Sequence, residues 1–404
     1  MGQKTLEWYK RWVGEELNGC IEFWLKNGLD NQNGGVYTCL DREGKLYSTD
    51  KSVWMQGRCA WTFANLCTTN GKNRKYMEAA KSCLDFLENH CINHDAKGRL
   101  YFTVTAEGEP LRQRRYRFSE AFYTMGNAEY ALASGEEEYL LRAKKYYDFI
   151  YEIANGMTED PAGLGSKTFT KTRKTRALAD PMIYLNLSAV MRRCDSANSA
   201  LYDKRALECV DAILRYHHKP ELRCTLETVG ENGEFLDRIS AGREINPGHS
   251  IECAWFLMEE ANYRNDDELY SKAVEMFDFA MERGWDDQYA GILYFVDALN
   301  FPPESYEHDM KLWWPHNEAA IASLMIYKDK GDEEYFKWFE RIIDYCDANF
   351  SDNEYGEWYG YLRRDGKPTS PPSKGTTFKG PFHLPRMLIM LDIMLRDIGN
   401  QQSR

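Results

Sequence analysis

Six polar residues recur at nearly even intervals along the chain, and most of them can carry a proton or hold an oxyanion. The gaps between consecutive members are 62, 66, 63, 67 and 67 residues, in the series Arg58, Glu120, Asn186, His249, His316 and His383. A histidine titrates near neutral pH and can both remove and return a proton, while an arginine binds oxygen atoms that bear negative charge. If these positions meet in one pocket, the sequence predicts acid–base chemistry there.

The helices that must position these residues are of two kinds. SIECAWFLMEEA (250–261) is rich in small and apolar residues all round, whereas ELYSKAVEMFDFAMERG (268–284) has a charged face. A helix of the first kind is buried, and one of the second kind lies on the outside. Similar segments follow one another along the chain, so we expect inner and outer helices in alternation.

A period of about 65 residues, repeated six times, accounts for nearly the whole chain. Each unit would supply an outer helix, a loop and an inner helix, which predicts an all-α fold, an (α/α)6 barrel, as a single domain over residues 1–404. Two hairpin-like stretches, VYTCLDREGKLYS (36–48) and GRLYFTVTAEGEPL (98–111), are expected at one mouth of the ring.

In such a ring the N-terminal ends of the inner helices converge on one cavity, where free backbone N–H groups and the helix dipoles favour oxyanions. His249, His316 and His383 would face it, together with Glu252 one turn after His249 and Glu318 beside His316. The other histidines are expected outside this pocket, at the ends of outer helices or in a loop: His90, His94, His217, His218 and His308.

Composition excludes several classes of protein. A net charge of −12 argues against wrapping around nucleic acid or an anionic membrane, and no apolar stretch is long enough to span a bilayer. The N-terminus lacks an apolar signal-peptide core, and the 11 cysteines are scattered without a C-x-x-C pair. We therefore expect a cytoplasmic protein with reduced cysteines and, since no zinc-binding motif is present, no metal site.

Long motifs give the sequence a resemblance to a known family. The stretches FSEAFYTMGNAEYA (118–131), NPGHSIECAWFL (246–257), WWPHNEAAIASLMIY (313–327) and FKGPFHLPRMLIML (378–391) closely resemble the N-acylglucosamine 2-epimerases, as does the opening segment 23–61. The resemblance covers nearly the entire chain and implies the same barrel. It also implies interconversion of N-acetyl-D-glucosamine and N-acetyl-D-mannosamine through an enediolate, with no net redox change.

The resemblance also implies roles for individual residues. His249 and His383 match the family's pair of catalytic histidines, and Arg58 matches the arginine of its W-x-Q-G-R stretch, which would hold the substrate oxygens. Glu318 and Glu252 match acidic positions that would orient a histidine, bind sugar hydroxyls or assist ring opening.

Further residues are candidates for substrate binding. Asn186 would contact the sugar, and His316 would position it rather than carry a proton. Three tryptophans are candidate stacking surfaces for the sugar, with packing inside the ring as the alternative for each: Trp54, Trp313 and Trp358.

The resemblance further implies a homodimer, an amino-sugar substrate and no consumed cofactor, with ATP as an activator. No P-loop motif explains ATP binding. The nearest candidate is GLGSKTFTKTRKTR (163–176), which would either bind a phosphate or be a solvated basic loop.

Three alternative functions remain open at this stage. Glu252 and Glu318 could serve an (α/α)6 glycoside hydrolase, although such an enzyme needs no histidine pair. A non-enzymatic binding protein is the second alternative, and it would have no use for both His249 and His383. The third is a neutral-sugar 2-epimerase or aldose–ketose isomerase acting on mannose, glucose or cellobiose, since an enediolate at C1–C2 leads to either product.

Overall fold

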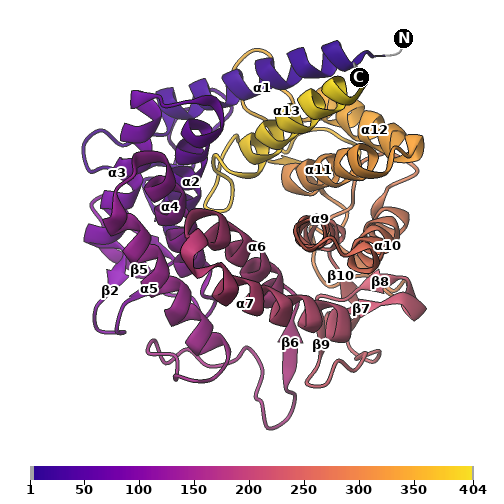
Figure 1. Cartoon of the computed structure of the whole chain (residues 1–404), viewed down its shortest axis with the longest axis horizontal. Helices are drawn as coiled ribbons and strands as arrows, with labels where there is room; N and C mark the ends of the chain where they lie inside the picture. The colour runs from indigo at the N-terminus through magenta and orange to yellow at the C-terminus, as the bar shows by residue number, and fades with distance from the viewer. Residues whose placement is uncertain (1–3, 403–404) are drawn as a thin grey trace.

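Helices dominate the chain and alternate between two rings. In the computed structural model, which describes residues 4–402, the inner ring consists of α2 (Val53–Asn70), α4 (Phe118–Ser134), α6 (Ala179–Cys194), α9 (Pro247–Arg264), α11 (Trp313–Lys330) and α13 (His383–Gln402). The outer ring consists of α1 (Leu6–Asn27), α3 (Arg74–His90), α5 (Glu137–Ala154), α7 (Ser199–Ala212), α10 (Asp267–Gly284) and α12 (Glu333–Asn349). Figure 1 shows both rings around a common centre.

The inner ring is closed. Each inner helix contacts the inner helix on either side, and the last of them, α13, contacts the first, α2. Each also packs against one outer helix, so that α1 lies along α13 and the two ends of the chain meet (Figure 1). These contacts confirm the predicted (α/α)6 barrel. All six of the evenly spaced polar residues fall within the first eight residues of the inner helices.

The two faces of the ring differ in the length of their connections. The turns from inner to outer helices are short: 71–73, 135–136, 195–198, 265–266 and 331–332. Gly135 (φ 84°) and Gly331 (φ 71°) end α4 and α11 in the left-handed conformation that glycine adopts without a steric penalty. The loops that lead into the inner helices are much longer, and they surround the mouth at which the predicted site residues lie.

Short antiparallel strands stiffen these long loops. One three-stranded sheet joins β1 (Lys51–Ser52), β4 (Thr103–Val104) and β5 (Pro110–Arg112). The remaining strands pair in twos: β2 (Ile92–Asn93) with β3 (Arg99–Leu100), β6 (Thr175–Ala177) with β9 (Thr228–Gly230), β7 (His218–Lys219) with β8 (Cys224–Thr225), β10 (Glu244–Ile245) with β11 (Val296–Asp297), and β12 (Lys311–Leu312) with β13 (Tyr361–Leu362). The hairpin predicted at 98–111 is confirmed by β4 and β5, whereas 36–48 is held by isolated bridges such as that between Leu40 and Leu46.

Two buried lysines anchor the loops that enter α2 and α11. Lys51 Nζ donates to Asp30 Oδ2 at 2.7 Å and to two backbone carbonyls, and Lys311 Nζ donates to Asp286 Oδ2 at 2.9 Å. A buried ammonium is tolerated when it is paired in this way. Because each lysine directly precedes an inner helix, these pairs fix where α2 and α11 begin, and hence where their first turns present side chains to the cavity.

Glycine allows the closest approach between inner helices. A Cβ on Gly57 of α2 would lie 2.4 Å from the carbonyl oxygen of Phe122 on α4, and a Cβ on Gly126 would lie 2.8 Å from the carbonyl oxygen of Gly57. This contact also places Arg58 against α4, with its guanidinium 4.0 Å from the centre of the Phe122 ring.

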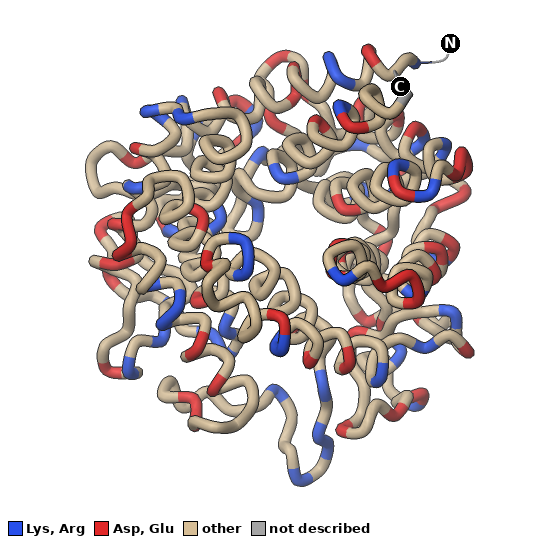
Figure 2. The backbone as a smooth tube through the Cα atoms, in the orientation of Figure 1, with Lys and Arg blue, Asp and Glu red and all other residues tan. Residues whose placement is uncertain are grey.

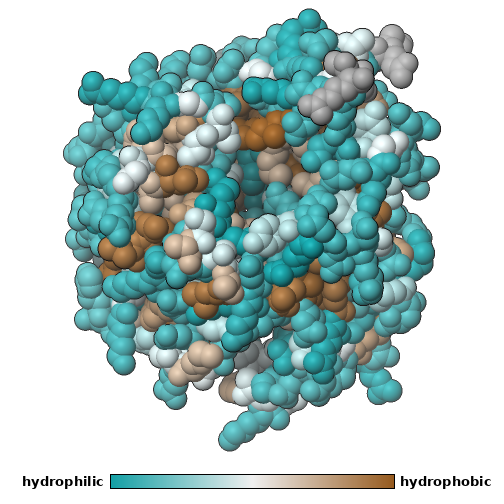
Figure 3. Space-filling model, in the orientation of Figure 1, coloured by the Kyte–Doolittle hydropathy of each residue, from teal (hydrophilic) through white to brown (hydrophobic). Residues whose placement is uncertain are grey.

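Charged residues of both signs cover the outside of the ring (Figure 2). The loop that precedes β6 carries a run of basic residues, seen in blue in Figure 2: Lys167, Lys171, Arg173, Lys174 and Arg176. The face in Figure 3 is largely hydrophilic and is hollowed at its centre. Within residues 4–402, no helix combines the length and the apolar character needed to cross a bilayer. All eleven cysteines are free thiols.

Candidate active site

His249 lies in the first turn of α9 and is paired with a carboxylate. Asn246 caps this helix by accepting a hydrogen bond from the His249 N–H at 3.1 Å, and Pro247 begins it. The His249 side chain is 29% exposed, and its Nδ1 lies 3.0 Å from Glu227 Oε1. Burial alone would lower the pKa of His249, but the Glu227 carboxylate raises it above its ordinary value. His249 is thereby favoured in its protonated form.

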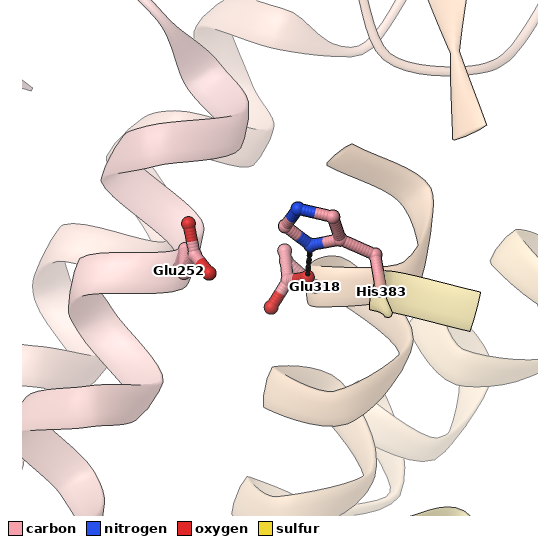
Figure 4. A group of neighbouring side chains, drawn as sticks. All are labelled: Glu252, Glu318 and His383. Atoms are coloured by element: carbon pink, nitrogen blue, oxygen red, sulfur yellow. Dashed lines mark hydrogen bonds and ion pairs between the residues drawn. The ribbon is translucent and has the colours of Figure 1, made fainter. Parts of the chain in front are cut away.

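His383 is the first residue of α13 and lies deeper. Its side chain is 8% exposed, and its Nδ1 lies 2.7 Å from Glu318 Oε1 (Figure 4). A carboxylate only accepts hydrogen bonds, so Nδ1 carries the hydrogen and Nε2 is left with a lone pair. Burial lowers the pKa of His383 well below its ordinary value, and the positive charges of Arg58 and Arg386 lower it further. His383 is therefore neutral near physiological pH and can act as a base at Nε2.

Glu252 and Glu318 form a buried cluster with His383 (Figure 4), and Arg386 completes it. Arg386 Nη2 donates to Glu252 Oε1 at 2.6 Å and to Glu318 Oε1 at 2.7 Å, while Trp255 Nε1 donates to Glu318 Oε2 at 2.8 Å. One ligand atom from each of Glu252, Glu318 and His383 lies within 4.8 Å of the others, a spacing that resembles a metal site. However, the guanidinium already balances both carboxylates, so this donor set suits an arginine rather than a metal ion.

Trp314 joins the two histidines along one wall. Its ring centroid lies 5.0 Å from that of His249 and 5.7 Å from that of His383. The two imidazoles therefore contact the same indole and are separated by no more than the width of that ring and its contacts. This arrangement is what proton transfer to opposite sides of one small molecule requires.

Arg58 and Trp54 lie one turn apart on α2 and offer hydrogen-bond donors to the cavity. The Arg58 guanidinium lies 4.0 Å from the Phe122 ring centre and 4.7 Å from that of Phe382, and burial lowers its pKa to about 9. Within residues 4–402, Arg58 Nε and Trp54 Nε1 are buried without a hydrogen-bond acceptor. Because an unpaired buried donor is costly, these two groups are suited to bind oxygen atoms of a ligand.

His316 does not reach the cavity, in contrast to the expectation that it positions the substrate. It is fully buried, its Nδ1 donates to the Leu312 carbonyl at 2.7 Å, and its Nε2 accepts the Ile292 N–H at 2.9 Å. Burial lowers its pKa to about 3. Residues two apart on a helix point in nearly opposite directions. Since Glu318 faces the site, His316 faces away from it.

The three predicted tryptophans divide between the site and the wall of the ring. Trp54 is at the site, and Trp313 lies beside His383 with ring centroids 6.1 Å apart. Trp358 is fully buried, stacks on Phe350 at 5.9 Å, and donates a hydrogen bond to Glu16 of α1. The packing alternative therefore describes Trp358.

The remaining sequence-based predictions concern Asn186, His217 and His218. Asn186 is half-buried on α6, and no hydrogen bond within residues 4–402 joins it to the histidine pair. His217 and His218 lie at the end of outer helix α7, as expected for cap residues, and both are buried. His217 Nδ1 contacts the Leu226 carbonyl at 2.8 Å, because a π-helical turn (Ile213–His217) leads from α7 directly into β7.

Three residues of the site were not predicted as part of it: Glu227, Trp314 and Arg386. Arg386 follows His383 by three residues, which places both on one helix face, so the spacing contained a usable signal. Glu227 lies in a loop 22 residues before His249, and nothing in the local pattern distinguishes it from other loop carboxylates.

The ring and its central residues define an acid–base enzyme: the pKa of one histidine is raised, the pKa of the other is lowered, and Arg58 beside them is suited to an oxyanion. Comparison with known proteins places the chain more narrowly. Residues 35–379 match the family described as N-acylglucosamine 2-epimerase (GlcNAc 2-epimerase). The chain belongs to this family, and it is an epimerase-type isomerase.

Relatives and solved structures agree with this assignment. The chain is 37% identical to the human N-acylglucosamine 2-epimerase over 396 residues, which cover 97% of this chain and 91% of that protein. It is 26% identical to a cellobiose 2-epimerase of Ruminococcus albus, with 91% of this chain and 94% of the other covered. The structure of the cellobiose 2-epimerase of Spirochaeta thermophila superposes with a TM-score of 0.82 at 20% identity, covering 97% and 98% of the two chains.

Proposed function

We propose that the protein interconverts N-acetyl-D-glucosamine and N-acetyl-D-mannosamine by moving the proton on C2. The observation that carries the proposal is the pair of histidines on either side of Trp314, of which His249 has a raised pKa and His383 a lowered one. Two bases that share one proton are what inversion at a carbon requires, because one removes a proton from one side while the other supplies a proton to the opposite side.

The reaction begins from the open-chain sugar, whose C1 carbonyl makes the C2 proton acidic. Nε2 of the neutral histidine takes this proton, the C2–H electron pair becomes the C1=C2 double bond, and O1 becomes the oxyanion of an enolate whose C2 carries the acetamido group. Arg58 is positioned to bind O1, since its guanidinium packs against Phe122 and Phe382 and its Nε donor is buried and unpaired within residues 4–402. In an enclosed site such a donor stabilises the developing charge strongly.

Return of a proton from the other histidine to C2 inverts this carbon and neutralises the enolate as O1 becomes a carbonyl oxygen again. With His383 as base, His249 is the acid, and in the reverse direction the roles exchange. Glu318 and Glu227 each hold the Nδ1 side of one histidine, which leaves Nε2 of both rings for the substrate. The scheme needs no metal ion and consumes no cofactor.

The acetamido sugar is favoured over neutral sugars by the relatives. The N-acylglucosamine 2-epimerases are 36–37% identical to this chain, whereas the cellobiose 2-epimerases are 23–26% identical. A neutral-sugar 2-epimerase or an aldose–ketose isomerase is the second candidate, since both would remove the C2 proton in the same way, to form a C1–C2 enediolate.

A glycoside hydrolase is poorly supported by the geometry. Glu252 and Glu318 both accept from the same nitrogen of Arg386, and their nearest oxygens lie within 4.8 Å of each other. A hydrolase needs two carboxyl groups on either side of a scissile bond, at least about 5 Å apart, with one of them free to protonate the leaving oxygen.

The resemblance to the family also motivates three further parts of the proposal: a homodimer, a cytoplasmic location and activation by ATP without its consumption. The loop 163–176 is the candidate for a phosphate contact. Lys174 in this loop pairs with Glu231 at 2.5 Å and Lys167 lies 5.0 Å from the Tyr116 ring centre, so their charges are partly engaged by neighbouring loops.

The test is proton NMR in D₂O with N-acetylmannosamine and the purified enzyme, with and without ATP. Formation of N-acetylglucosamine that carries deuterium at C2 is expected. No exchange under either condition would contradict the N-acyl epimerase function. The same experiment with mannose, glucose and cellobiose tests the second candidate, because turnover of these sugars alone would replace the proposal.

A further inference from the structure

Arg386 is a buried arginine at the centre of the site whose role the proposed reaction does not yet include. It lies one turn after His383 on α13 and is 3% exposed. Three aromatic rings surround its guanidinium carbon, with centroid distances of 5.1 Å to Trp255, 5.8 Å to Phe256 and 4.8 Å to Phe382. Its position is therefore fixed by packing as well as by hydrogen bonds.

The charges around His383 come from every element packed against it. They are Arg58 on α2, His249 and Glu252 on α9, Glu318 on α11 and Arg386 on α13. Apart from the histidines, two carboxylates face two guanidinium groups, so the buried cluster is neutral overall. Both carboxylates depend on one guanidinium nitrogen, Nη2 of Arg386, which also lies 3.3 Å from His383 Nδ1.

The short distance between Arg386 and His383 is a charge contact and not a hydrogen bond. Arginine can only donate, and the hydrogen on Nδ1 is already directed to Glu318. Two positive charges at this distance repel, so Arg386 opposes protonation of His383 while it stabilises the carboxylate that orients the ring. Both effects favour the neutral ring with a lone pair on Nε2.

We infer that Arg386 is a positioning residue that keeps His383 neutral and correctly oriented by balancing the charges of Glu318 and Glu252. The inference rests on the proposed function, because it assigns the base within that site. Without Arg386, two carboxylates would face Arg58 alone, and the excess negative charge would be relieved by protonation of His383. The ring would then be an imidazolium held by Glu318, and it could not accept the C2 proton.

Arg386→Met provides the test, with kcat/KM and KM measured across pH. The acid limb of the profile is expected to move to higher pH by about 1 to 3 units, since that is the usual effect of one neighbouring charge on a pKa. In Arg386→Met combined with Glu252→Gln, one negative charge is removed with the positive one, so the acid limb should return toward that of the wild type. If Arg386→Met acted only by disturbing the structure, the added Glu252→Gln substitution would not restore the acid limb.

Arg192 supplies a matched control. It is a partly buried arginine between two acids, at 2.7 Å from Glu260 and 2.9 Å from Asp203, but it lies near the far end of α6. Arg192→Met should lower the thermal stability and leave the acid limb unchanged. If Arg386→Met does not fold, Glu252→Gln alone tests the inference. This variant leaves the positive charge of Arg386 with one carboxylate fewer to balance it, so the acid limb should move to lower pH.

Titration of ¹⁵N-labelled histidine in the ligand-free enzyme separates this inference from the proposed function. It reports the pKa of His383 without any substrate, and Arg386→Met should raise that pKa even if the sugar assignment is wrong. Coincident His383 titrations in the wild type and Arg386→Met, or no difference between the single and the double variant, would overturn the role of Arg386.

Discussion

His249 at the N-terminal end of α9 and His383 at the N-terminal end of α13 are the same type of side chain in opposite electrostatic surroundings. His249 is 29% exposed, is paired with Glu227 and lies near two further carboxylates, Glu252 and Glu244. His383 is 8% exposed and faces two arginines as well as its carboxylate. The pKa of the first is raised and that of the second is lowered. Both residues are histidines in the first turn of an inner helix, so the difference between their pKa values comes from their neighbours. Those neighbours suit His249 to act as the acid and His383 to act as the base.

The largest effect is expected when either histidine is removed. His383→Ala and His249→Ala should each lower epimer formation by about 10² to 10⁴, the usual contribution of a general acid or base. Each variant keeps one histidine, so it should still exchange the C2 position of one sugar with solvent. The measurement is deuterium loss in H₂O from C2-deuterated N-acetylmannosamine and N-acetylglucosamine, followed separately.

The two variants should lose label from different sugars, which would assign each histidine to one side of C2. Loss of label from both sugars in the same variant would contradict the assignment of one face to each histidine.

Arg58→Lys is expected to have the next largest effect, a loss of about 100-fold in kcat/KM, as for removal of one oxyanion donor. Lysine keeps the charge but cannot lie flat between the rings of Phe122 and Phe382 while donating to O1. Arg192→Lys is the control, since Arg192 lies 3.6 Å from the Tyr263 ring centre and away from both histidines. A loss in Arg58→Lys no greater than in Arg192→Lys would refute the O1 contact.

Glu227→Gln should have a smaller effect, confined to one side of the pH profile. The carboxylate raises the pKa of His249, so the protonated acid persists to higher pH, and activity is lost as the pH rises through that pKa. Without the charge, the alkaline limb should move to lower pH by about 1 unit or more, and the rate near pH 8 should fall about 10-fold.

The acid limb, which reports His383, should stay unchanged in Glu227→Gln. Glu275→Gln is a matched control because Glu275 pairs with His218 at 3.0 Å outside the site. An alkaline limb that stays in place in Glu227→Gln would mean that Glu227 does not hold the proton of His249.

The smallest effect on activity is expected for His316→Leu. The Leu312 carbonyl and the Ile292 N–H would each lose a buried hydrogen bond, so the free energy of unfolding should fall by about 2 kcal/mol or more. Denaturant unfolding measures this loss, and kcat/KM of the folded variant should remain within about 3-fold of the wild type, because the ring has no free nitrogen at the cavity. A large loss of kcat/KM with unchanged stability would show that His316 takes part in the active site.

The fold could be predicted because its signal is repeated. Inner helices are apolar nearly all round and outer helices have charged faces, and six copies of this contrast define a ring even when single boundaries are uncertain. The long loops were less predictable: 36–48 has the local antiparallel bridge expected of a hairpin, between Leu40 and Leu46, but Asp41 is also bridged to the distant Ser373. Such contacts depend on neighbours that only the closed ring provides.

The site was predictable where its residues lie on helices and less so elsewhere. Spacings of three or four place Glu252 under His249 on the cavity face, while a spacing of two separates His316 from Glu318. The same rule would have found Arg386 and excluded His316. Glu227 comes from a loop, where no periodicity exists, so its contact with His249 depends on tertiary structure alone.

Closure of the ring by its first and last helices has a consequence for the order of events during synthesis. Trp12 on α1 donates to Asp347 on α12 at 2.9 Å across 335 residues of sequence, and α1 also packs along α13. The proposed base and its arginine are on α13, so a ribosome has made the other five inner helices before either is available. Until α12 and α13 have been made, α1 lacks their part of the surface that covers its apolar face, and the nascent chain is most exposed to aggregation. If His383 is the base, a chain cut before α13 lacks it and should be inactive.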